Sequence, residues 1–79
     1  MDPNSELILF MARNLVENPD QVEVTRTEGD KGVVYELRVA ARDLGKVIGR
    51  NGKTARSMRA VLGAVLSRKG ERAQLNIDG

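Results

Sequence analysis

The residues best suited to chemistry in this chain lie in one short stretch, Gly49-Arg50-Asn51-Gly52-Lys53. Glycine has no Cβ, so a turn between two glycines lets another backbone come close. The first amides of a helix that starts at Lys53 would be unpaired and would lie at the positive end of its dipole. Such a helix start favours phosphate, and Arg50 and Lys53 add full positive charges to it. The stretch therefore predicts a binding site for a phosphate-bearing ligand.

The chain has few residues of the types that catalyse reactions or bind metal ions. The chain has no histidine and no cysteine, the usual zinc ligands, and histidine is also the usual activator of a nucleophilic serine. Eight acidic residues are spread out with no paired spacing: Asp2, Glu6, Glu17, Asp20, Glu23, Glu28, Asp30 and Glu36. Gly52-Lys53-Thr54 matches the end of a phosphate-binding P-loop, but that motif needs a further glycine where Val47 stands. We therefore expect no enzyme, no cofactor and no metal site.

Charge is divided unevenly along the chain, although the net charge is only +2. Residues 1–37 hold three basic and eight acidic side chains, whereas residues 38–72 hold ten basic and two acidic ones. A basic half of this kind is typical of a surface that binds nucleic acid. A solvated helix face would give a similar charge pattern, so the charge alone leaves both interpretations open.

Length and composition indicate one small globular domain, with 79 residues, 41% hydrophobic and 30% charged. Without cysteine there is no disulfide framework, and no apolar run approaches the roughly 20 residues that cross a bilayer, so we expect a cytoplasmic protein. Aromatic residues make up only 3%, namely Phe10, expected in the core, and Tyr35, expected on a sheet. Nucleic-acid modules that stack bases on aromatic platforms are therefore disfavoured.

The sequence predicts six elements in the order α-β-β-α-α-β. Hydrophobic periodicity and turn residues place them at 3–17 (helix), 21–28 and 33–40 (strands), 42–48 and 53–69 (helices) and 72–77 (strand). The expected fold class is α+β, a single domain over residues 1–79 with a three-stranded sheet and its helices on one face. We expect an N-terminal helix at about 3–17 and the rest of the domain at about 21–78.

Both long helices have more apolar or small positions than one sheet contact needs. The predicted core positions of the first helix are Leu7, Ile8, Met11 and Leu15, which leave Leu9, Ala12 and Val16 on another face. The predicted core positions of the long helix are Met58, Val61, Leu62, Val65 and Leu66, which leave the small residues Ala60, Gly63, Ala64 and Ser67. The second faces indicate either a thin solvent-exposed surface or a contact with another chain, most simply in a homodimer.

The stretch from Lys46 to Thr54, between a short and a long helix and preceded by Val39-Ala40 and Arg42-Asp43, resembles a type II KH domain. With its length and its N-terminal helix, the chain is similar to the KhpA-like small bacterial KH-domain RNA-binding proteins, and the resemblance covers nearly all of it. One minor departure is Ala41, where many members of that family have proline.

The resemblance implies a protein that binds single-stranded RNA, roughly four nucleotides of it, by clamping its backbone at the Gly-x-x-Gly turn. The residues expected to contact RNA are Gly49, Arg50, Asn51, Gly52, Lys53, Lys46, Arg56, Ile48, Val47 and Leu44, with at least one of Val47 and Ile48 also in the core. It further implies homodimers, a heteromer with a larger KhpB or Jag-type KH protein, RNA chaperoning, and links to cell elongation and cell-wall homeostasis. The alternative is a protein-interaction or ribosome-assembly module whose basic turn does not bind free RNA.

Overall fold

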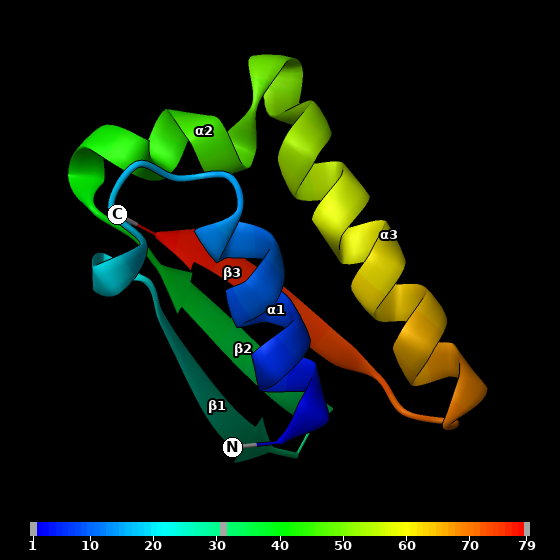
Figure 1. Ribbon diagram of the computed structural model, residues 1–79. Coiled ribbons are helices and arrows are strands. Elements are labelled where there is room, and N and C mark those ends of the chain that lie inside the picture. Colours follow the sequence, from blue (N-terminus) through cyan, green and yellow to red (C-terminus); the bar gives the residue numbers. More distant parts are fainter. Residues whose placement is uncertain (1, 31, 79) are drawn as a thin grey trace.

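The computed structural model describes residues 2–30 and 32–78, so Lys31 of the predicted turn lies outside the described residues. Its main elements are α1 (Pro3–Arg13), β1 (Glu23–Gly29), β2 (Gly32–Arg38), α2 (Leu44–Ile48), α3 (Lys53–Arg68) and β3 (Ala73–Asp78). Short 3-10 turns lie at Pro19–Gln21, Ala41–Asp43 and Arg50–Gly52. The predicted order α-β-β-α-α-β and the α+β class are confirmed (Figure 1).

The three strands form one mixed sheet in the order β1-β2-β3. β1 and β2 are antiparallel neighbours, with Gly29 opposite Gly32, whereas β2 and β3 run parallel. Parallel neighbours need a long crossover, and α2 and α3 together supply it. Figure 1 shows α1 and α3 on the same face of the sheet and α2 near the end of β3. β3 is therefore an edge strand, and its free edge runs along α3.

The core lies between that face of the sheet and the helices. Tyr35, Leu37 and Leu75 point inward from neighbouring strands and are almost completely buried, while Glu36 and Asn76 on the opposite face are exposed. This alternation is the expected pattern for an outer sheet face left to solvent. On α3 the buried positions Met58, Leu62 and Leu66 recur at helical spacing, as predicted, but Val61 is 46% exposed.

The predicted inward face of α1 is partly wrong, although Ile8 is buried and Met11 packs against the core as predicted. The helix buries Ile8, Leu9 and Ala12, whereas Leu15 is 38% exposed and Phe10, expected in the core, is 67% exposed. Leu9 and Ala12, assigned above to a second contact, are core residues. The helix also ends at Arg13, before the predicted end near Glu17.

Polar contacts at the start of α1 explain which face turns inward. The hydroxyl of Tyr35 donates a hydrogen bond to Asp2 Oδ2 (2.6 Å) and accepts one from Asn4 Nδ2 (3.3 Å). Asn4 is buried, and so is Ser5, whose hydroxyl donates to Oδ1 of the same Asp2 (2.5 Å). These bonds fix the rotation of the helix about its axis, so the side chains one and two turns further along, Ile8, Leu9 and Ala12, enter the core.

Candidate nucleic-acid interface

The Gly-x-x-Gly turn between α2 and α3 is built from unusual backbone conformations. Gly49 has φ 75° and ψ 173°, and Asn51 (φ 56°) and Gly52 (φ 74°) follow in the left-handed region. Glycine enters these regions freely, and asparagine tolerates the left-handed one better than most residues. The turn is closed by hydrogen bonds from Gly49 N to the Gly45 carbonyl (2.9 Å) and from Gly52 N to the Gly49 carbonyl (3.1 Å).

The two glycines are needed for different reasons. A Cβ added at Gly49 would lie 2.7 Å from Cβ of Thr54 and 2.9 Å from its backbone nitrogen, which is a severe overlap. A Cβ added at Gly52 would meet only the mobile end of Arg56, 3.6 Å away at Nη1. Gly49 is therefore required by packing within the protein, while Gly52 leaves the outer surface of the turn open to a ligand.

Three exposed cations surround this open surface: Arg50, Lys53 and Arg56. None of them forms an ion pair with a carboxylate in the described part of the chain. Lys46, also predicted to bind RNA, differs because its Nζ lies 3.6 Å from Glu17 in an exposed pair. No side chain caps the start of α3 among the described residues, so the turn combines helix amides, left-handed backbone and unpaired charge.

The predicted apolar floor is only partly at the surface. Val47 is completely buried in the core, whereas Ile48 is 36% exposed and Leu44 is half-buried. α2 is barely more than one turn long, so only one of its sides faces the core, and Val47 lies on that side. Val47 therefore supports the surface from beneath, and contact with a ligand is left to Leu44 and Ile48.

A buried carboxylate just before α2 holds the turn region to the rest of the fold. Asp43 is completely buried and accepts hydrogen bonds from the amides of Glu17 (3.2 Å) and Asn18 (3.0 Å) and from Nδ2 of Asn18 (3.0 Å). Burial alone would raise the pKa of Asp43, but these hydrogen bonds outweigh it and hold the pKa below its ordinary value. This role of Asp43 was not predicted from the sequence, although Asp43 is one of only two acids among residues 38–72.

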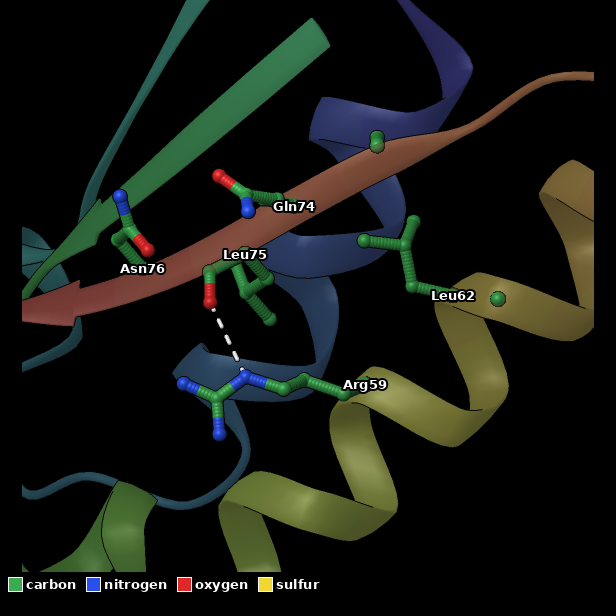
Figure 2. Close-up of a pocket in the computed structure, with 7 residues that line it drawn as sticks. Arg59, Leu62, Gln74, Leu75 and Asn76 are labelled. Atoms are coloured by element: carbon green, nitrogen blue, oxygen red, sulfur yellow. Dashed lines mark hydrogen bonds between the residues drawn. The ribbon is translucent and has the colours of Figure 1, made fainter. Parts of the chain in front are cut away.

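A groove between α3 and the free edge of β3 was not predicted from the sequence. Its lining residues are Arg59, Leu62, Gly63, Ala73, Gln74, Leu75 and Asn76, and its volume is about 360 Å³. Nε of Arg59 donates a hydrogen bond to the Leu75 carbonyl (3.1 Å) across it (Figure 2). Among the small residues noted above on α3, Gly63 proves to line this groove. Sequence periodicity gives no sign of the groove, because it depends on which strand ends up beside α3.

An apolar strip lies on the other side of α3, where that helix faces α1. It is formed by Met11, Leu15, Thr54, Ser57, Met58 and Val61. Leu15 and Val61 are the most exposed large apolar members of this strip. These two residues are therefore the most exposed part of the strip; Phe10 of α1 is more exposed (67%) but lies outside it, and Leu9 and Ala12 are buried.

Within residues 2–30 and 32–78, no group of acidic side chains is arranged to hold a metal ion. The described helices include none that is long and apolar enough to cross a membrane.

Comparison with known sequences points to a single protein family. The family model described as "KhpA/KhpB, KH domain" matches residues 5–77. The chain is 44% identical over 77 residues to the RNA-binding protein KhpA of Aquifex aeolicus, covering 98% of both chains. It is 44% identical over 72 residues to that of Borreliella burgdorferi (91% of this chain, 88% of the relative). The Streptomyces coelicolor KhpA is 48% identical over 60 residues, 76% of each chain.

Solved structures show the same fold at much lower identity. An Era variant from Aquifex aeolicus bound to GDP·AlF4⁻ superposes with a TM-score of 0.68 at 17% identity, over 95% of this chain. Era in complex with MgGDPNP and nucleotides 1506–1542 of 16S ribosomal RNA superposes with a TM-score of 0.66, also at 17% identity. This chain spans about 30% of either Era chain, so these likenesses concern the fold alone.

Proposed function

Because the chain belongs to the KhpA/KhpB KH-domain family, we propose that it binds single-stranded RNA at its Gly-x-x-Gly turn. The observation that carries this proposal is the combination of three unpaired cations with the open surface at Gly52. The printed names of the KhpA relatives, RNA-binding proteins, support the choice of ligand. We include a cytoplasmic setting in the proposal, because that is where free single-stranded RNA would be met.

The proposed mechanism is binding without covalent chemistry. The RNA backbone lies against Gly52, where no Cβ blocks its approach, and the first amides of α3 face a phosphate. Arg50, Lys53 and Arg56 neutralise the phosphates on either side. The side chain of Asn51 is exposed and supplies a further hydrogen bond to the sugar-phosphate backbone.

The bases are proposed to lie beside the clamp on apolar surface. Leu44 and Ile48 supply that surface next to the turn, and the groove between α3 and β3 extends it along the helix. Roughly four nucleotides would occupy such a site. With three neutralised phosphates, the affinity should fall with a logarithmic salt slope of about −2, or roughly 20-fold between 50 and 200 mM salt.

We further propose that the protein acts as a homodimer joined through the apolar strip that includes Leu15 and Val61. Two clamps in one particle would raise avidity for RNA through effective concentration. A heteromer with a KhpB or Jag-type protein, RNA chaperoning, and a role in cell elongation and cell-wall homeostasis are proposed from the family resemblance.

The test compares two double variants that make the same chemical change at different places. Arg50→Asp/Asn51→Asp alters the turn, and Arg13→Asp/Asn14→Asp alters the end of α1, where the same dipeptide is exposed. Both glycines stay, because any side chain at Gly49 would overlap Thr54. Each variant is titrated into fluorescent, mixed-sequence single-stranded RNA at 50 and 200 mM salt, after circular dichroism has confirmed that it is folded.

The proposal expects the turn variant to bind at least 10-fold more weakly than the wild type at 50 mM salt, since it loses one cation and gains two repelling carboxylates. The α1 variant, with the same change in net charge, should stay within about 3-fold of the wild type. If both variants lost the same amount of RNA affinity, the change in net charge alone would explain the loss, and the clamp proposal would be refuted. A folded wild type that binds no RNA would leave the protein-interaction or ribosome-assembly module as the better account.

A further inference from the structure

The guanidinium of Arg59 is held in place before any ligand arrives. Its Nε–H donates to the Leu75 carbonyl at 3.1 Å, on the free edge of β3. This bond spans from the middle of α3 to the strand, so it restrains a side chain that would otherwise sample many rotamers. A donor fork that is fixed in advance loses less entropy when it binds.

The bond to Leu75 leaves the two terminal nitrogens available. Figure 2 shows one of them pointing away from the Leu75 carbonyl and the other at the side of the guanidinium. Neither has a hydrogen-bond or carboxylate partner in the described part of the chain. Together they form the end of a planar fork that matches two adjacent acceptor atoms.

The groove around this fork has apolar side chains at its base and open space above α3. Leu62 and Leu75 are buried and apolar, and Ala73 is half-buried beside them. A Cβ added at Gly63, one turn beyond Arg59 on α3, would meet nothing within 4 Å, so the space over this residue is open. Glycine in the middle of a helix destabilises it by about 1 kcal/mol relative to alanine.

We propose that Arg59 is a specificity-determining residue that selects guanine in the groove between α3 and β3. Guanine presents O6 and N7 as adjacent acceptors, and arginine pairs with both at once. Adenine presents N7 beside an amino group, which opposes one arm of the fork. This inference rests on the proposed RNA-binding function and adds a base preference to it. Two phosphate oxygens have the same acceptor chemistry, so the test must separate a base from a phosphate.

The experiment measures affinity for a labelled single-stranded uridine octamer with one variable nucleotide near its centre. That nucleotide is guanosine, inosine, 7-deazaguanosine, adenosine or uridine. Inosine keeps both acceptors, whereas 7-deazaguanosine lacks N7 alone. The wild type should bind the guanosine and inosine octamers about equally, and about 5- to 10-fold more tightly than the other three.

Arg59→Lys tests the fork while keeping the charge. It should bind all five octamers within about 3-fold of one another, at an affinity close to that of the wild type for the uridine octamer. Arg68→Lys makes the same change at an exposed position in the last turn of α3 and should keep the guanosine preference. Gly63→Leu, which has open space at the surface and should fold, fills the groove and should also abolish the preference.

The outcomes separate this inference from the function on which it rests. A wild type that binds all five octamers equally well overturns the base selection and leaves RNA binding intact. An Arg59→Lys variant that weakens every octamer by the same factor would show that Arg59 contacts a phosphate, which also overturns it. A wild type that binds none of them overturns the proposed function itself.

Discussion

Replacing Gly49 with alanine should destabilise the protein far more than the same change at the other glycine of the turn. Gly49 has φ 75° and ψ 173°, a region almost restricted to glycine, where another residue costs roughly 1–3 kcal/mol. The new Cβ would also lie 2.7 Å from Cβ of Thr54 and 2.9 Å from its nitrogen, and such overpacking costs roughly 1–3 kcal/mol more. The expected total is about 2–6 kcal/mol.

Two matched substitutions separate backbone strain from overlap. Gly52→Ala has the strain of a left-handed backbone, about 1–2 kcal/mol. Its added Cβ would meet only Nη1 of Arg56, at 3.6 Å. Gly63→Ala has neither, because its φ is not positive and nothing lies within 4 Å, so it should stabilise α3 by about 0.5–1 kcal/mol. The predicted order of stability is Gly63→Ala, wild type, Gly52→Ala, Gly49→Ala.

The assay is urea unfolding followed by far-ultraviolet circular dichroism, with the slope of the transition checked for constancy across the series. A domain of this length is stable by roughly 4–12 kcal/mol, so the Gly49→Ala loss is a large part of the total. If Gly49→Ala unfolded within about 0.5 kcal/mol of Gly52→Ala, Thr54 would have moved aside and the overlap argument would be wrong.

Two further predictions concern acid stability and association. The lowered pKa of Asp43 means that its contribution to stability is complete above the unfolded value near 3.8 and is lost as the pH falls through the folded value. The melting temperature should therefore fall more steeply below about pH 4 in the wild type than in Asp43→Asn, and parallel curves would contradict this. Val61→Glu should turn a micromolar dimer into a monomer in sedimentation, while Ser67→Glu should not. A wild type that stays monomeric at every concentration would remove the proposed interface.

Local signals in the sequence were sufficient for the element order and for the turn. Gly49 to Gly52 and the alternation of the strands each depend on residues close together in the chain, so tertiary structure did not override them. The burial of Val47 also agrees with the expectation that at least one of Val47 and Ile48 is a core residue. The assignment of RNA contacts to these residues stays a prediction.

The inward face of α1 could not be read from periodicity, because residues 7–12 are all apolar. A helix with such a run has no unique hydrophobic side, and the choice is made by the bonds of Asp2 and Asn4 to Tyr35, more than 30 residues away in sequence. The groove beside Arg59 was missed for a related reason. It exists because β3 pairs in parallel with β2 and so becomes the edge strand next to α3.

Different side chains of α3 are proposed to govern different properties of the protein, so these assignments can be tested together. Met58 faces the core, Val61 the apolar strip, Arg56 the turn and Arg59 the groove. Arg56 and Met58, like Arg59 and Val61, are two positions apart and so point about 200° apart around the helix axis, which means that substitutions within each pair should change different properties. Truncating Met58 should change the free energy of unfolding, and changing Val61 should change association. Loss of Arg56 should lower the salt slope, whereas loss of Arg59 should remove base preference. A Val61 variant that altered base preference without altering association would show that the faces are coupled, and the division of α3 would have to be abandoned.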